Sequence, residues 1–307
     1  MGAIRVTQRM LVDRILNNLA YQSRKILSLQ EQLATGYKVN RPSDNPLNTR
    51  SAISAQVRIY QNEQYLSNIT SAKPYLNETE SSIMTVMNIV QRAKELALQG
   101  MNGSNSQLQR DQIATEVNQL VEALVKEANH QTYGKYIFGG TVTMTKPFQE
   151  SRNLAGEINA VTYVGNDEYS YIEISEGARV NINLTGREVF LPTITGSTDI
   201  FQSIINLRDD LRASNFGGIQ QRIDELTRAI NQLALALAKV GSVTNRMENT
   251  ERDLENANIE LRRVISDNID ADMAEVIVNL NSQSNAYQSA LNAASRVIQP
   301  SLLDYIR

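Results

Sequence analysis

Both ends of the chain carry an apolar stripe with helical spacing. Near the N-terminus, apolar residues recur at alternating steps of three and four, which keeps them on one helical face. This N-terminal stripe consists of Val12, Ile15, Leu19, Ile26, Leu29 and Leu33, with Gln22 as its polar interruption. At the C-terminus, Met273, Leu280, Tyr287 and Ala294 recur at every seventh position. Because such stripes expose apolar surface unless they are paired, we expect them to pair with each other or with a neighbouring subunit.

The longest helical pattern lies between residues 219 and 265. It keeps a regular seam over its whole length and contains no proline. At about 1.5 Å per residue, a helix of this length extends about 70 Å, which exceeds the diameter of a small domain. The pattern therefore predicts a rod. We interpret this central seam as the inward face of a helix bundle, and the terminal stripes as contacts between subunits.

Two further helices and a short β region complete the predicted layout. One helix is expected over residues 47–101, kinked or split at Pro74, and another over residues 106–131. After Gly134 the apolar residues alternate, with turns at residues 165–167 and 176–177, which predicts a small antiparallel domain. The fold class is thus mainly α: a long-helix coiled-coil rod built from both chain ends, with an inserted antiparallel β domain.

These patterns predict three parts. Residues 1–45 and 268–307 are expected to form terminal helices at the core of a polymer. Residues 46–140 and 201–267 are expected to form a helical rod domain, and residues 141–200 the inserted β domain.

Composition argues against several classes of function. The net charge of −3 gives no basic surplus for nucleic-acid binding, and the absence of cysteine removes disulfides and thiolate metal sites. The single histidine, His130, lies at a polar helix end and makes a histidine-based catalytic or zinc site very hard to build. We therefore expect no catalytic, metal or cofactor site and no enzymatic activity.

Membrane insertion and Sec-dependent secretion are also unsupported. No apolar run approaches the roughly 20 residues needed to span a bilayer. Arg5, Arg9 and Arg14 interrupt the first twenty residues, so the apolar core of a cleaved signal peptide is missing there.

Two segments carry a family resemblance. Residues 33–57 include the sequence NRPSDNP, and residues 270–306 begin with Asp270-Ala271-Asp272. Both resemble the flagellin superfamily, in its hook-filament junction branch, and the Tyr136-to-Gly140 and Lys146-to-Phe148 segments resemble the branch's transition into its β domain. The turn motif consists of Gly36, Asn40, Arg41, Pro42, Ser43, Asp44 and Pro46. Gly36 is expected to end the first helix, and Ser43 or Asp44 to cap the next.

The resemblance implies a structural subunit of the bacterial flagellum. Such a protein is exported through the type III apparatus without a cleaved signal peptide and forms an extracellular ring at the hook-filament junction. Its implied partners are further copies of itself, the hook-side junction protein, flagellin and a cytoplasmic export chaperone, with no nucleic acid and no membrane. The C-terminal assembly and chaperone face is assigned to Met273, Ile277, Leu280, Tyr287, Leu291 and Ile298.

Two other functions stay open at this point. One is a short filament-forming flagellin, which the NRPSDNP turn and the KPF boundary argue against. The other is a coiled-coil surface adhesin or phage-tail component, with the β insert as its ligand-binding head.

Overall fold

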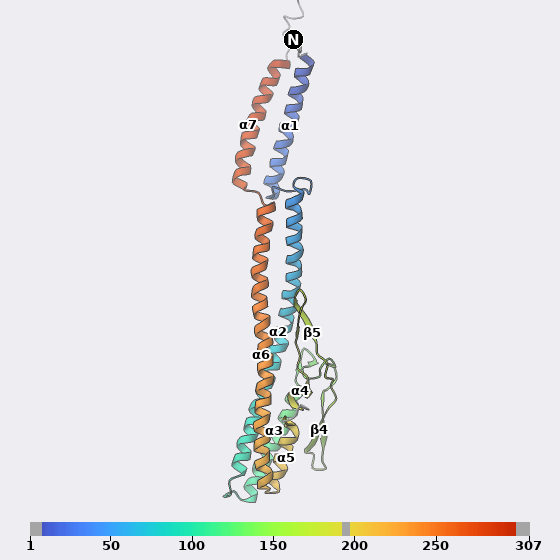
Figure 1. The fold of residues 1–307 in the computed structure, drawn as a ribbon, viewed down its shortest axis with the longest axis vertical. Coiled ribbons are helices and arrows are strands. Elements are labelled where there is room, and N and C mark those ends of the chain that lie inside the picture. Colours follow the sequence, from blue (N-terminus) through green and yellow to red (C-terminus); the bar gives the residue numbers. More distant parts are fainter. Residues whose placement is uncertain (1–7, 192–196, 299–307) are drawn as a thin grey trace, which may run out of the picture. The chain divides into compact units, whose positions relative to one another are not determined.

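The computed structural model describes residues 8–191 and 197–298. Within these ranges the protein is mainly helical with short antiparallel hairpins, which confirms the predicted fold class. The helices are α1 (Gln8–Thr35), α2 (Pro46–Gly100), α3 (Gln107–Ala128), α4 (Gly186–Phe190), α5 (Ile200–Arg212), α6 (Phe216–Ile269) and α7 (Met273–Ile298) (Figure 1). No helix in the described ranges is long and apolar enough to cross a lipid bilayer.

The described residues form two compact units. The terminal unit comprises residues 8–61 and 256–298, and the central unit comprises residues 62–255. Helices α2 and α6 each contribute to both units. The β insert lies inside the central unit, and the three-part division expected from the sequence remains a prediction.

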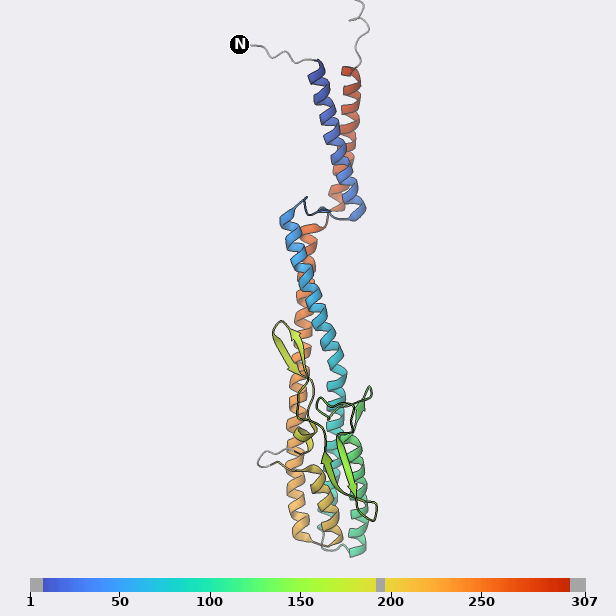
Figure 2. The ribbon, with the colours of Figure 1, turned by 90° about the vertical axis from the view of Figure 1, so that its right-hand side faces the viewer.

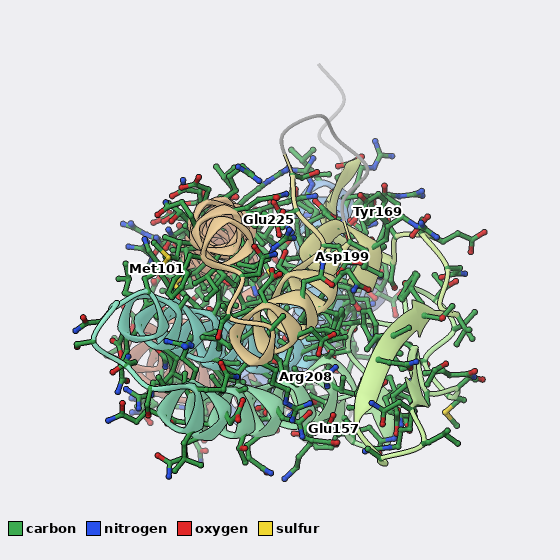
Figure 3. All side chains as sticks on the ribbon, turned by 90° about the horizontal axis from the view of Figure 1, so that it is seen from below. Met101, Glu157, Tyr169, Asp199, Arg208 and Glu225 are labelled. Atoms are coloured by element: carbon green, nitrogen blue, oxygen red, sulfur yellow. The ribbon has the colours of Figure 1, made fainter. Side chains whose placement is uncertain are left out.

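The central unit is a helix bundle with a single apolar core. Seen end-on in Figure 3, α2, α3, α5 and α6 surround one interior. Val86, Val121, Ile204 and Leu226 are fully buried, one from each helix. The central seam predicted for α6 therefore faces a bundle interior over residues 219–254, because its apolar residues in this range belong to this core or pack against it.

Three antiparallel hairpins make up the β region. They pair β1 (Gln131–Thr132) with β2 (Lys135–Tyr136), β3 (Phe148–Arg152) with β4 (Ile158–Tyr163), and β5 (Tyr171–Ser175) with β6 (Ala178–Asn181). Strands β3 and β4 pack on α3, and β4 also packs on α5. Phe148 anchors the insert, because its ring lies 5.1–5.2 Å from those of Phe190 and Phe201.

Helix α2 runs through Pro74 without splitting. Proline lacks the N–H that would bond the carbonyl one turn earlier, on Thr70. Both residues are exposed, so water can satisfy that carbonyl and the helix continues. The alternative of a split helix at Pro74 is therefore wrong.

Candidate assembly surface

The N-terminal stripe packs against α7. Helices α1 and α7 lie side by side in both views of the ribbon (Figures 1 and 2). Leu29 is buried between them. The other members of the stripe, Val12, Ile15, Leu19, Ile26 and Leu33, are half-buried. Their spacing of three and four residues places them on the face of α1 that meets α7.

The residues predicted to form the C-terminal assembly and chaperone face lie on two different sides of α7. Leu280 and Tyr287 are half-buried and share a helical side with the buried Val276 and Ala294, which together form the inner seam of α7. Three predicted members of the face, Met273, Ile277 and Leu291, instead lie on an adjacent flank with 40–46% of their surface exposed. The side chain of Ile298 lies outside the described residues. We call Met273, Ile277 and Leu291 the outer flank of α7.

Helix α1 has exposed apolar residues too, and sequence analysis missed them. Leu16 is 51% exposed and Leu27 is 60% exposed. They lie three turns apart on one side of the helix, next to the stripe that faces α7. Their position beside the stripe could have identified them in the sequence, because a contact between only two helices does not cover apolar side chains at the edge of a stripe. The pair of terminal helices therefore presents apolar surface from both of its members.

The turn after α1 is formed by a glycine and an aspartate. Gly36 has φ of +78°, and its N–H donates to the Gln32 carbonyl oxygen at 2.8 Å, so Gly36 ends α1 as predicted. The carboxylate of Asp44 accepts the backbone N–H groups of Asn40 and Arg41, at 3.2 and 2.9 Å. The Asp44 N–H also donates to the Arg41 carbonyl at 2.9 Å, so the backbone and the side chain of Asp44 together close the turn.

The cap of α2 differs from the prediction. Asn45 is the capping residue, because its Oδ1 accepts the N–H of Asn48 at 3.1 Å. Ser43 and Asp44 were expected to cap, but Asp44 is used inside the turn. Pro46 begins the helix, which suits proline because the first helical N–H has no partner inside the helix.

The two connections of the terminal unit are bonded to each other. The Lys38 N–H donates to the Ile269 carbonyl at 2.7 Å, and the Ala271 N–H donates to the Gly36 carbonyl at 2.8 Å. These bonds form an isolated antiparallel bridge between Tyr37 and Asp270. The segments between α1 and α2 and between α6 and α7 therefore form one joint.

Side chains reinforce the joint. Asn48 Nδ2 donates to the Asn268 carbonyl at 3.2 Å, and Lys38 Nζ donates to the Asp267 carbonyl at 2.6 Å. Asp272 Oδ1 accepts the N–H groups of Ala274 and Glu275, so Asp272 caps α7. The predicted helix opening at residues 270–272 is thus present.

Titratable groups elsewhere have structural partners. His130 Nε2 lies 2.7 Å from Glu78 Oε1, and its other ring nitrogen lies 3.8 Å from Glu127. Burial raises the pKa of Tyr75 to about 12, and its hydroxyl donates to the Ile137 carbonyl. Within residues 8–191 and 197–298, no group of three or more His, Asp or Glu side chains is arranged to hold a metal ion.

This chain is similar to several known flagellar proteins. The flagellar hook-associated protein 3 of Escherichia coli (strain K12) is 24% identical over 312 residues, 94% of this chain and 96% of the relative. The flagellar filament 33 kDa core protein of Treponema phagedenis is 26% identical over 306 residues, 97% of each chain. The crystal structure of the flagellar junction protein FlgL from Legionella pneumophila shares the fold, with a TM-score of 0.61 at 16% identity, over 72% of this chain and 100% of that one.

Family profiles cover both chain ends. Residues 6–143 match the bacterial flagellin N-terminal helical region, and residues 221–306 match the bacterial flagellin C-terminal helical region. These matches take in both terminal helices, the joint and most of the bundle. The chain therefore belongs to the bacterial flagellin family, whose members are structural and non-enzymatic proteins.

Proposed function

We propose that this chain is a structural subunit of the junction between the hook and the filament of a bacterial flagellum. It assembles as an extracellular ring after type III export and contacts the hook-side junction protein on one side and flagellin on the other. The proposal is supported by the alignment with a hook-associated protein 3 over nearly the whole of both chains.

One structural observation carries the assembly mechanism. Pairing α1 with α7 partly covers the N-terminal stripe and the inner seam of α7 but leaves Leu16, Leu27 and the outer flank of α7 exposed. Exposed apolar residues on two adjoining helices are a typical protein–protein contact surface. We therefore assign the outer flank of α7, with Leu16 and Leu27 of α1, to contacts between subunits. The N-terminal stripe and the inner seam of α7 are assigned to pairing within a subunit.

Loss of the protein tests the junction function. In a host that lacks this chain, hooks should be assembled without filaments, and flagellin monomers should be shed into the medium. Reintroducing the chain should restore attached filaments. Filaments of normal length on hooks without this chain would overturn the proposal.

The assembly surface can be tested separately from folding. Leu291→Asp places a charge on the outer flank, so filament attachment should be lost while the helix content of the purified chain is unchanged. A matched control is Leu235→Asp, on α6 of the central unit, where Leu235 is 74% exposed. This control should retain attachment. Equal attachment in both variants would remove the outer flank from the assembly surface.

Helix α7 is also our proposed binding site for an export chaperone. A chaperone that binds an amphipathic helix in a hydrophobic groove buries helix residues spaced three and four apart. Binding to the whole predicted face requires α7 to leave α1, because Leu280 and Tyr287 are half-buried in the α1–α7 pair. Binding to the outer flank alone leaves the pair intact.

Two single variants distinguish these chaperone modes. Leu280→Asp and Leu291→Asp should both weaken chaperone binding, measured by calorimetry, if the whole face is used. Only Leu291→Asp should weaken it if the outer flank alone is used. Unchanged affinity in both variants would remove the chaperone from this helix.

A second candidate function is a filament subunit. It is favoured by the alignment with a filament core protein over 97% of each chain. The purified chain distinguishes the two functions, because a filament subunit should polymerise alone into long filaments, whereas a junction subunit should stop at rings or short oligomers.

A further inference from the structure

The connection between α2 and α3 contains the chain's one Asn-Gly sequence, Asn102-Gly103. This connection, residues 101–106, lies at the end of the bundle that Figure 3 views, beside the labelled Met101. Asn102, Gly103 and Ser104 are exposed, so water reaches both the backbone and the side chain at this step. Asparagine is a chemically labile residue, and a following glycine leaves its side-chain amide open to attack by the next backbone nitrogen.

Hydrogen bonds hold the side-chain amide of Asn102 in a position that favours this attack. Its Oδ1 accepts the Ser104 N–H at 3.2 Å and the Ser104 hydroxyl at 3.0 Å. These bonds fold the side chain back over the peptide unit that contains the Gly103 nitrogen. When a nitrogen adds to the amide carbon, negative charge develops on the amide oxygen, and two donors already directed at this oxygen stabilise that charge.

The attacking nitrogen, on Gly103, is accessible. Among the residues that the structure describes, its N–H has no hydrogen-bond partner. A Cβ added to Gly103 would meet no atom within 4 Å apart from its chain neighbours, so the space around this residue is open. Hydroxide can therefore reach the N–H and remove its proton, and no side chain blocks the approach of the nitrogen to the Asn102 amide.

We propose that Asn102 is a site of spontaneous modification, in which it closes a cyclic imide with Gly103 and loses its amide group. The Gly103 nitrogen gives its proton to hydroxide and forms a bond to the side-chain amide carbon of Asn102. The bond from that carbon to Nδ2 breaks, and Nδ2 takes a proton from water and leaves as ammonia, which regenerates the hydroxide. Water then opens the ring at either carbonyl carbon, so position 102 becomes aspartate or isoaspartate. The net reaction consumes water and releases ammonia.

Asn105, in the same connection, is protected from this reaction. Its Nδ2, the leaving group, donates to the Gln99 carbonyl at 2.6 Å. The nitrogen that would attack belongs to Ser106, and its N–H donates to Gln109 Oε1 at 2.7 Å. Both atoms would have to give up a hydrogen bond before the ring could close, so we expect Asn105 to keep its amide.

Asn153, in the turn between β3 and β4, differs from Asn102 chiefly in the residue that follows it. Its Oδ1 accepts two N–H groups, from Ala155 and Glu157, each at 3.0 Å. The next residue is Leu154, whose bulky side chain hinders ring closure at its own nitrogen. Asn153 is therefore an internal control with a similarly bonded amide oxygen and without the glycine.

The modification changes both the charge and the connectivity of the turn. Either product carries a carboxylate, so the modified chain gains a negative charge at the end of the bundle. In isoaspartate the main chain runs through the former side chain, and the carbonyl that accepts the Asn105 N–H at 3.1 Å becomes part of a carboxylate. Copies of different age therefore differ at this end of the central unit, whether the chain is a junction subunit or a filament subunit.

Peptide mass spectrometry of the purified full chain tests the reaction. The chain is incubated in mildly alkaline buffer, samples are digested at intervals, and fragment spectra assign each replacement of NH2 by OH to a residue. We expect Asn102 to be converted at least about tenfold faster than Asn105 and Asn153. The rate should rise with hydroxide concentration, because the Gly103 nitrogen must lose its proton. An enzyme that methylates isoaspartate should label the same peptide.

Exchanging the residue after each asparagine gives a matched pair of variants. Gly103→Leu fits without strain, because Gly103 does not have a positive φ and the space around it is open. This variant should slow conversion of Asn102 to the rate of Asn153. Leu154→Gly, at a fully exposed side chain, should accelerate conversion of Asn153 towards that of Asn102.

The hydroxyl of Ser104 is tested by Ser104→Ala, which removes one of the two donors to the Asn102 amide oxygen. Conversion of Asn102 should slow severalfold, and conversion of Asn153 should not change. Two results would overturn the proposal: an Asn102 that is converted no faster than Asn153 in the native chain, or an unchanged rate in Gly103→Leu, which would mean that water attacks the amide directly. Neither result would bear on the junction function, which filament attachment measures separately.

Discussion

At the scale of single residues, the buried Arg208 connects three elements of the central unit. Arg208 is only 2% exposed and is among the largest fully buried side chains of the described structure. Its Nη1 donates to Asn118 Oδ1 at 2.9 Å and to the Ile158 carbonyl at 2.8 Å, and its Nε pairs with Asp209. In Figure 3 it lies between the helices and the strand side of the molecule. Arg208 thus joins α5 to α3 and to β4.

Replacing this arginine should destabilise the central unit strongly. Arg208→Met keeps most of the apolar stem but removes the donor to the half-buried Asn118 oxygen and to the buried Ile158 carbonyl. An unsatisfied buried polar group costs about 1–3 kcal/mol, so we expect the free energy of unfolding to fall by about 2–4 kcal/mol. The exposed Arg179→Met is the control and should change it by less than about 0.5 kcal/mol. Urea unfolding measures both, and equal values would contradict the role of Arg208.

The Glu157–Arg212 pair makes stability depend on acid pH. Hydrogen bonds at 2.6 and 2.8 Å from the Arg212 guanidinium lower the pKa of Glu157 from 4.5 to about 2. A lowered pKa in the folded state stabilises the protein above the unfolded pKa, and that contribution is lost as pH falls from about 4.5 towards 2. The Arg212 side chain is 38% exposed, so solvent screening limits the contribution to about 1–2 kcal/mol.

Glu157→Gln should remove this part of the pH dependence. We expect the difference in unfolding free energy between the native chain and the variant to be about 1–2 kcal/mol at pH 7 and to vanish near pH 2. Urea unfolding at pH 7, 4.5 and 2.5 measures it. Glu176→Gln, at the exposed turn between β5 and β6, is the matched control, and a pH-independent difference for Glu157→Gln would rule out the linkage.

At the scale of elements, Pro74 weakens α2 without breaking it. Pro74→Ala restores the missing hydrogen bond to Thr70 and relieves the clash of the proline ring with the preceding turn. The added freedom of the unfolded chain offsets part of this gain. We expect the unfolding free energy to rise by about 1–2 kcal/mol with an unchanged denaturant slope, measured by urea unfolding. A less stable variant would show that the chain packs around the proline.

Local chemistry explains which elements the sequence predicts well. Helix limits follow from apolar periodicity and from breakers, so α2 and α6 begin and end within a few residues of their predicted limits. Strand β3 carries no such signal, because Phe148 is its one apolar residue and the other four residues of FQESR are polar. Which strands pair is set by contacts distant in sequence, so β3–β4 pairing could not be derived from periodicity.

The candidate assembly surface, too, could be predicted from the sequence only in part. Apolar periodicity identified the N-terminal stripe and the inner seam of α7, since their residues repeat regularly along α1 and α7. Periodicity grouped Met273 and Ile277 with Leu280, because residues three and four apart are neighbours on a helix. Only the position of α1 distinguishes the inner seam of α7 from its outer flank. The cap of α2 was within reach of sequence, because Pro46 at the first helical position makes Asn45 the capping residue.

At the scale of the whole molecule, the two units differ in how much apolar surface they bury. Among the side chains that the structure describes on α1 and α7, the buried apolar residues are Leu29, Val276 and Ala294. The central unit has a continuous core that runs from Ile69 to Leu254 and includes four phenylalanines. Since burial is the dominant favourable term in folding, the terminal helices are held far less strongly than the bundle.

Hydrogen exchange of the isolated chain should reveal this difference. Backbone amides of residues 12–34 and 276–296 should exchange at least about tenfold faster than those of α5 and of residues 219–254, which corresponds to an opening free energy lower by about 1.4 kcal/mol or more. Leu29→Ala should accelerate exchange in α1 and α7 further and leave the central unit unchanged. In assembled flagella the same amides should be protected, because neighbouring copies cover the exposed flanks. Equal protection of α1, α7 and the bundle in the isolated chain would mean that the terminal pair is stable alone, and ordering of the ends could not then be coupled to assembly.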